Sequence, residues 1–193
     1  DRSKTYGEAL TLGSTEFTAS GLVNGDAVTS VTLASDGAAA TAVVDEYDIT
    51  ATGAVGPKLG NYTISYAKGT LTVNPKALTI TAKNRSKTYG QTLTLGSTEF
   101  TASGLVNGDA VTSVTLASDG AAATAVVNTY EITSSAAQGP KLGNYTISYA
   151  KGTLTVNRKA LTITASDRSK TYGTALTLGT TEFTASGLVN GDA

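Results

Sequence analysis

The most regular alternation of apolar and polar residues runs through residues 61–73 and returns unchanged at residues 144–156. Alternation with a period of two is typical of half-buried strands. Between the two alternating arms stand Lys68 and Gly69, and Gly adopts the positive φ that a two-residue hairpin turn needs. The pattern therefore predicts a β-hairpin with large apolar residues on one face and Thr and Ser on the other. The predicted pairs are Tyr66 with Leu71 and Ile64 with Val73.

Further strands are predicted by alternation in the second copy of this pattern. They are residues 77–82, residues 88–95 with an interruption at Gly90, residues 100–105, residues 110–118 with a possible bulge, and residues 129–133. Leu78 and Ile80 should point inward. Asn107-Gly108 is the strongest turn signal in the chain, and residues 121–127 read as strand or coil because the run is too short for an isolated helix.

The chain of 193 residues is a tandem repeat with a period of 83, because residues 1–7 recur at 84–90 and 167–173. A period of this length suits a small autonomous domain better than one coil of a solenoid. The prediction is an all-β chain of tandem small β-sandwich domains arranged end to end. The predicted domains are residues 1–75, a first repeat lacking its initial strand, residues 76–157, a complete second repeat, and residues 158–193, a partial third repeat.

Junctions between the predicted domains are short, with about three residues between the last strand of one repeat and the first strand of the next. They contain no Gly or Ser, and Pro75 fixes φ in the first of them. Short, stiff junctions predict neighbours that are held nearly end to end. Neighbouring repeats of the same chain are therefore the first expected partners.

Composition narrows the possible functions. Cys, His, Met and Trp are all absent, which excludes common zinc sites, Ser-His-Asp triads and Cys-His dyads. The 14 basic residues are scattered and the formal net charge is -1, which argues against nucleic-acid binding. No apolar run is long enough to span a membrane. We therefore expect no enzyme, no catalytic residue, no cofactor and no metal.

One segment differs between the copies more than the rest. The first two copies differ at 12 of 83 positions, and seven of these lie in residues 45–55. We interpret the segment as a loop with an adjoining strand edge and as a candidate binding loop. Its candidate residues are Asp45, Glu46, Asp48, Thr52 and Val55. A catalytic carboxylate pair is disfavoured, because Asn128 and Thr129 replace Asp45 and Glu46 in the second copy.

Four motifs in a fixed order resemble the MBG repeat of the Tyr-Gly type. They are Tyr6-Gly7, residues 20–26, residues 61–73 and residues 76–82. The resemblance covers essentially the whole chain and implies an immunoglobulin-like sandwich or a β-grasp variant; the lack of an obvious helix favours the sandwich. It also implies an extracellular bacterial protein, on the cell surface or secreted, with a stalk-like or adhesive role. No catalytic or ligand residues come with it.

These observations lead to three hypotheses. The first is a structural stalk or spacer of a bacterial adhesin-like or surface filament protein. The second is an adhesive module that binds a host or bacterial surface glycan or protein through residues 45–55. The third is a self-assembling filament, in which residues 160–165 of another copy fill the strand position that the first repeat lacks. A window cut from a longer array would have the same open position, so association must be measured.

Overall fold

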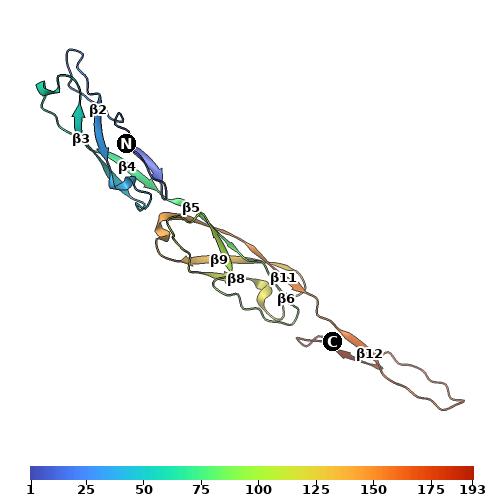
Figure 1. Cartoon of the computed structure of the whole chain (residues 1–193). Helices are drawn as coiled ribbons and strands as arrows, with labels where there is room; N and C mark the ends of the chain where they lie inside the picture. Colours follow the sequence, from blue (N-terminus) through green and yellow to red (C-terminus); the bar gives the residue numbers. More distant parts are fainter. The chain divides into compact units, whose positions relative to one another are not determined.

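A computed structural model describes residues 1–193, and its regular structure consists of β-strands and four short 3₁₀ helices (Figure 1). The all-β prediction is confirmed. The first repeat contains β1 (Arg2–Thr5), β2 (Ser30–Ala34), β3 (Glu46–Val55) and β4 (Gly69–Asn74). The second contains β5 (Lys76–Ala82), β6 (Arg85–Thr88), β7 (Phe100–Ser103), β8 (Ser113–Ala117), β9 (Thr129–Gln138), β10 (Tyr145–Ala150) and β11 (Gly152–Asn157). The third contains β12 (Thr162–Ala165) and β13 (Phe183–Ser186); the 3₁₀ helices are Asp36–Ala38, Leu59–Asn61, Asp119–Ala121 and Leu142–Asn144.

The chain divides into two compact units. The first unit comprises Asp1–Ile80, Ala102–Ser113 and Ala137–Ser148. The second unit comprises Thr81–Thr101, Val114–Ala136 and Tyr149–Ala193. The second repeat thus contributes to both units. The junction between the first and second repeats lies inside the first unit, because residues 1–80 and 102–113 belong to it.

Each of the first two repeats has a four-stranded sheet of the same order, β1-β4-β3-β2 in the first and β6-β11-β9-β8 in the second. The strand that comes first in the chain pairs in parallel with the strand that comes last. β1 pairs with β4, with Arg2 opposite Leu71, and β6 pairs with β11, with Arg85 opposite Leu154. Such a parallel pair requires a long connection between its strands. The four-stranded sheet is therefore complete only when the last strand of the repeat pairs with the first.

A second sheet of the second repeat has the order β10-β5-β7. Its central strand β5 buries Leu78 and Ile80 completely, which confirms their predicted inward orientation. A core cluster joins Ala82 of β5 to Ile132 and Leu154 of the four-stranded sheet. Partly buried residues pack against this cluster, namely Leu93, Leu95, Leu116 and Tyr130. Strands of two sheets therefore share one apolar core in this repeat.

The predicted hairpin is wrong. Its two arms in the second repeat are β10 and β11, which are consecutive in the chain but belong to different sheets. β11 pairs instead with β6 and β9, and β10 with β5. The chain thus passes from one sheet to the other at Lys151. The prediction failed because alternation fixes which side chains share a face but not which strand lies alongside.

Three further predictions concern local structure. The strand expected over residues 88–95 is not formed: β6 ends at Thr88, and the chain turns away at Gly90, which has a φ of +86°. Asn107 and Gly108 both have positive φ, so the predicted turn is confirmed. The bulge expected within residues 110–118 stays a prediction; in the equivalent pair of the first repeat, β2 and β3, a bulge is present with its extra residue on β3, where Gly53 has a φ of +59°.

Candidate functional site

The segment predicted as a binding loop is a strand. Glu46, Asp48, Thr52 and Val55 lie on β3, and Asp45 immediately precedes it. The Asp48 carboxylate accepts a hydrogen bond from Lys68 Nζ at 2.6 Å. This hydrogen bond and the charge of Asp48 raise the pKa of the Lys68 ammonium. The pair is exposed, so it contributes little to stability.

The five candidate residues do not line a common cavity. A groove in the first repeat is lined from the same strand by Ile49, Ala51 and Ala54 instead. Nor does the structure gather three or more acidic side chains in a group that could hold a metal ion. A binding role for β3 therefore rests on the sequence difference between the copies and stays a prediction.

A buried contact between consecutive repeats lies in the first unit. Tyr6 is fully buried, and its hydroxyl donates a hydrogen bond to Asp109 Oδ2 at 2.8 Å. The Tyr145 hydroxyl donates to the same oxygen, also at 2.8 Å. The two rings meet edge to face, 5.5 Å apart at 81°. Because the Asp109 side chain is only 3% exposed, both are hydrogen bonds to a carboxylate shielded from solvent.

Close backbone packing accompanies this tyrosine contact. Gly7 has a φ of +89°, and a Cβ built on it would lie 2.6 Å from Val106 Cγ2. Only glycine satisfies both conditions. Polar contacts flank the position: Asn107 Nδ2 donates to the Ala40 carbonyl at 3.0 Å. We call the contacts of Tyr6 with Asp109 and of Gly7 with Val106, together with the hydrogen bond from Asn107 to Ala40, the first Tyr-Gly junction.

The same contacts recur in the second unit. Tyr89 donates to Asp192 Oδ1 at 3.1 Å, and Asn190 Nδ2 donates to the Ala123 carbonyl at 3.0 Å. A Cβ on Gly90 would lie 2.6 Å from Val189 Cγ2. A Tyr-Gly pair thus contacts the Val-Asn-Gly-Asp motif of the repeat that follows it, at two successive junctions.

Burial of the motif tyrosine depends on the following repeat. Tyr6 faces a complete repeat and is 0% exposed, Tyr89 faces a partial one and is half-buried, and Tyr172 is 102% exposed. The three tyrosines occupy equivalent positions in near-identical sequence. Tyr6 and Tyr89 both stand in repeats that have a complete four-stranded sheet, so the difference in their exposure follows the extent of the repeat that each one contacts.

The junction changes the acidity of one tyrosine. Burial is the main cause that raises the pKa of Tyr145 to about 12, and the hydrogen bond to Asp109 and the negative charge of that carboxylate act in the same direction. A hydrogen bond from the Val106 amide acts in the opposite direction. Tyr145 therefore stays protonated, and remains a hydrogen-bond donor, well into the alkaline range.

A buried lysine lies in the first strand of each four-stranded sheet. Lys4 donates through Nζ to the carbonyls of Glu8 and Ala39, and Lys87 to those of Gln91 and Ala122. Burial lowers the pKa of both ammonium groups. Backbone carbonyls alone receive these hydrogen bonds, so the lysines tie the first strand to the loop beside it.

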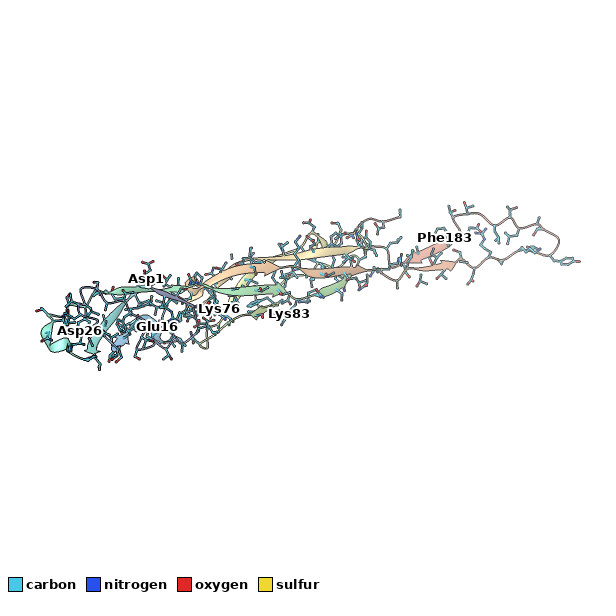
Figure 2. All side chains as sticks on the ribbon, turned by 90° about the horizontal axis from the view of Figure 1, so that it is seen from above. Asp1, Glu16, Asp26, Lys76, Lys83 and Phe183 are labelled. Atoms are coloured by element: carbon cyan, nitrogen blue, oxygen red, sulfur yellow. The ribbon has the colours of Figure 1, made fainter.

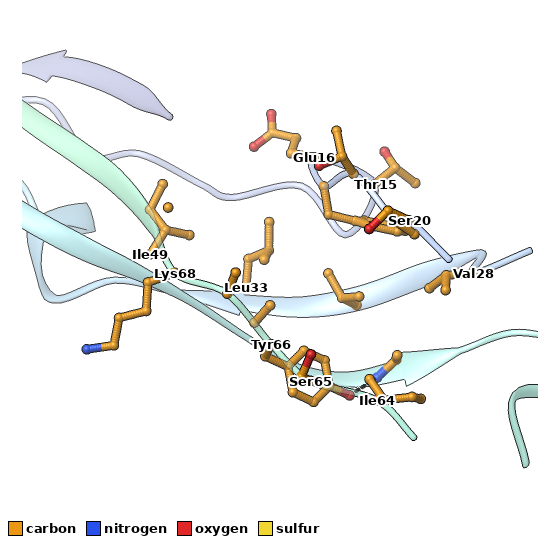
Figure 3. A pocket seen from close by; sticks show the side chains of 18 of the residues that line it. Thr15, Glu16, Ser20, Val28, Leu33, Ile49, Ile64, Ser65, Tyr66 and Lys68 are labelled. Carbon is orange, nitrogen blue, oxygen red and sulfur yellow. Dashed lines mark hydrogen bonds between the residues drawn. The ribbon is translucent and has the colours of Figure 1, made fainter. Parts of the chain in front are cut away.

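An open groove lies on the first repeat. Its volume is about 940 Å³, and Figure 3 shows Ser20 and Thr15 on one side with Ile64 and Tyr66 on the other. The Tyr66 hydroxyl accepts a hydrogen bond from the Ala54 amide at 3.0 Å across its floor. The groove walls, Phe17 to Ser20 and Tyr62 to Ala67, are not strands, whereas the identical sequences in the second repeat form β7 and β10.

Sequence reasoning did not find the Tyr-Gly junction. A usable signal existed, because the Tyr-Gly pair and the Val-Asn-Gly-Asp motif both recur in all three copies. Nothing in the linear pattern, however, brings Tyr6 next to a carboxylate 103 residues further on. The contact between Tyr6 and Asp109 depends on how one repeat packs against the next.

Comparison with known proteins identifies two tandem copies of one domain. The family model described as MBG domain (YGX type) matches residues 1–72 and again residues 78–155. A search of curated proteins finds no relative that matches the chain. None of the helices in the structure has the length and apolar character that crossing a membrane requires.

Proposed function

This chain belongs to the MBG domain family of the YGX type, and from that membership we propose that it is a stalk or spacer segment of a bacterial extracellular adhesin-like protein. MBG domains are repeat domains of surface proteins, which fits a structural role. In this proposal the chain acts on the bacterial surface or after secretion. Its proposed role is to extend and orient the parts of the protein that it connects, and it catalyses no reaction.

The first Tyr-Gly junction is the observation that carries the proposal. Tyr6, Asp109 and Tyr145 form a shielded hydrogen-bonded cluster across the boundary between two repeats. Such a cluster restricts rotation at the boundary more than a flexible linker does, because a rotation breaks hydrogen bonds to a buried carboxylate. The tyrosine–aspartate hydrogen bond recurs in more exposed form between Tyr89 and Asp192, which supports a restriction at the second boundary as well.

The two ends of a repeat carry different parts of this contact. In the first repeat, Asp26 lies at the end remote from Lys76, where the next repeat begins (Figure 2). Asp26 accepts from Tyr62 at 2.8 Å, as Asp109 does from Tyr145. The first repeat thus has its acidic motif at one end and its exit strand at the other, which supports serial docking along one direction.

Small-angle scattering on chains with two and four complete repeats tests the stalk. The maximum dimension should grow in proportion to the number of repeats. The Gly7→Ala variant and its equivalent at every junction should yield a broader distance distribution, because the added methyl displaces the following repeat. A maximum dimension that does not grow with repeat number would contradict the stalk.

An adhesive module is the second candidate. The observation that favours it is the concentration of differences between the copies in residues 45–55, with Val55 and Asp48 exposed on β3. The ligand in this case is a glycan or protein of a host or bacterial surface. Glycan arrays probed with the 193-residue chain and with an Asp48→Ala variant test this role. Equal signals from both chains, or no signal from either, count against it.

A further inference from the structure

The Asn-Gly turn of the second repeat belongs to the first Tyr-Gly junction and is open to solvent. Asn107 and Gly108 have φ of +56° and +74°, and the Asp109 amide closes the turn by donating to the Val106 carbonyl at 2.9 Å. Positive φ at both central residues is typical of a type I′ turn, which favours Asn-Gly. Both central residues are exposed. Water therefore reaches the Asn107 side chain although the turn contacts the preceding repeat.

Asn-Gly is a sequence in which the backbone can attack the side chain. The Gly108 nitrogen makes no hydrogen bond, and a Cβ on Gly108 would meet nothing within 4 Å, so this nitrogen is unshielded. When it loses its proton and attacks Cγ of Asn107, an N–Cγ bond forms and the side-chain nitrogen leaves as ammonia. One water molecule then opens the resulting succinimide ring and gives aspartate or isoaspartate. The reaction consumes water and needs no other reactant.

The docked junction holds the Asn107 side chain away from this reaction. Its Nδ2 donates a hydrogen bond to the Ala40 carbonyl of the first repeat at 3.0 Å. The side chain must rotate to bring Cγ to the Gly108 nitrogen, and this rotation breaks the hydrogen bond. Ring closure therefore follows a local opening of the junction, and the frequency of that opening limits its rate.

Deamidation removes the donor that this contact requires. The side-chain amide of Asn107 has donor hydrogens, whereas an ionised carboxylate only accepts. The new carboxylate faces the Ala40 carbonyl oxygen with no proton between them, and it adds a negative charge two residues from Asp109, whose side chain is 3% exposed. Isoaspartate also inserts the side-chain methylene into the backbone of the turn. Both products therefore disfavour the closed junction.

From this contact and this chemistry we propose that Asn107 is a site of spontaneous deamidation and that the modification opens the first Tyr-Gly junction irreversibly. The second junction has the same arrangement, because Asn190 has a φ of +57° and its Nδ2 donates to the Ala123 carbonyl at 3.0 Å. Consecutive repeats thus begin docked and lose their docking with age. The inference does not rest on the stalk proposal, because an adhesive module with this junction would age in the same way.

Peptide mapping by mass spectrometry tests the modification. The 193-residue chain is incubated at mildly alkaline pH, and conversion is followed at Asn107 and at Asn24. Asn24 lies in the same turn, closed by the Asp26 amide and the Val23 carbonyl at 2.9 Å, but its side chain has no hydrogen-bond partner in this chain. Asn24 should convert about tenfold faster, the factor expected for one protecting hydrogen bond. Equal rates at the two sites would contradict the protection by the junction.

Tyr6→Phe tests whether opening of the junction controls the rate. This variant loses the hydrogen bond to Asp109 and leaves the Asn-Gly turn itself unchanged. It should raise the rate of conversion at Asn107 about tenfold and leave the rate at Asn24 unaltered. Tyr172→Phe, at the equivalent but exposed position, is the matched control and should change neither rate. A rate at Asn107 that does not respond to Tyr6→Phe, or no conversion there at all, would overturn the inference.

Hydrogen exchange tests the consequence of the modification. The Val44 amide of the first repeat donates to Asn144 Oδ1 of the second repeat at 2.9 Å, so its exchange rate reports opening between the repeats. Asn107→Asp reproduces the charge of the product and should speed exchange at Val44 about tenfold. Asn24→Asp adds the same charge to the equivalent turn of the first repeat, at the end remote from the second, and should have no effect.

Two further amides show whether the repeats stay folded in these variants. Val73 donates to a carbonyl within the first repeat and Val156 to one within the second, both at 2.9 Å. Their protection should be the same in the unmodified chain and in both variants. Unchanged exchange at Val44 in Asn107→Asp, or equal acceleration in the two variants, would show that deamidation does not open the junction.

Discussion

The hydroxyl of Tyr6 lies 2.8 Å from Oδ2 of Asp109, a residue of the following repeat that is 103 positions away in the chain. Removing this hydroxyl leaves the buried carboxylate with one fewer hydrogen bond. We expect Tyr6→Phe to lower the free energy of unfolding by about 2 kcal/mol, as is typical of a hydrogen bond to a charged group. Urea unfolding of the 193-residue chain measures the change.

Tyr172 provides the matched control for this substitution. It occupies the equivalent motif position and is fully exposed. Tyr172→Phe should therefore change stability by no more than about 0.5 kcal/mol, the usual range for exposed sites. Similar losses in the two variants would mean that the junction does not account for the role of Tyr6.

Gly7 offers a second test, because two different costs can be separated. Gly7 and Gly173 have φ of +89° and +84°, so alanine at either position pays the cost of the left-handed conformation, about 1 kcal/mol. A Cβ on Gly173 meets nothing within 4 Å, whereas one on Gly7 collides with Val106. Gly7→Ala should thus cost more than Gly173→Ala, and thermal unfolding measures the difference.

A double variant checks the cause of the Gly7 effect. If the collision with Val106 Cγ2 is responsible, Val106→Ala should relieve part of the loss in a Gly7→Ala background. The two substitutions should then be less destabilising together than the sum of the single changes. Strict additivity would assign the whole cost of Gly7→Ala to its backbone conformation.

The raised pKa of Tyr145 predicts a loss of stability in alkali. A tyrosine titrates near 10 in the unfolded chain and at about 12 here, because burial disfavours the phenolate. The folded state therefore holds the proton more tightly, and this contribution is fully present below pH 10 and lost between pH 10 and 12. Unfolding measured across this range should show a steeper loss for the unmodified chain than for Tyr145→Phe. Parallel profiles would contradict the assignment.

Ser134 is a position where a substitution should stabilise the chain. Its hydroxyl is buried on β9 without a hydrogen-bond partner, and the first repeat has Ala51 at the equivalent position. Ser134→Ala should raise the free energy of unfolding by about 1 kcal/mol, because an unsatisfied buried hydroxyl is costly. The exposed neighbour Ser135 provides the control, and Ser135→Ala should be nearly neutral. A loss of stability in Ser134→Ala would indicate that its hydroxyl has a partner.

Local patterns in the sequence predicted the buried faces of strands and the positions of turns better than they predicted which strands pair. Leu78 and Ile80 are buried as their alternation with Thr indicates, and Asn107-Gly108 forms its turn. The hairpin failed because its arms satisfy the same alternation in two separate sheets. Period-two alternation defines an inner face, whereas pairing depends on which strand arrives beside it.

The candidate site shows the same limit. Differences between copies in residues 45–55 suggested a loop, yet Tyr47 and Ile49 alternate with polar residues and form part of β3. The Tyr-Gly junction could not be derived, because it joins Tyr6 to Asp109 only after both repeats have folded. Identical segments that are strands in one repeat and irregular in the other show that local sequence alone does not decide the outcome.

The parallel pairing of β1 with β4 bears on how a repeat responds to mechanical force. β1 begins at Arg2 and β4 ends at Asn74, so a pull on the two ends of the first repeat slides these strands along each other. In this geometry the hydrogen bonds of the ladder are loaded together instead of opening one after another. A repeat anchored at one end and pulled at the other therefore resists extension through its whole ladder at once.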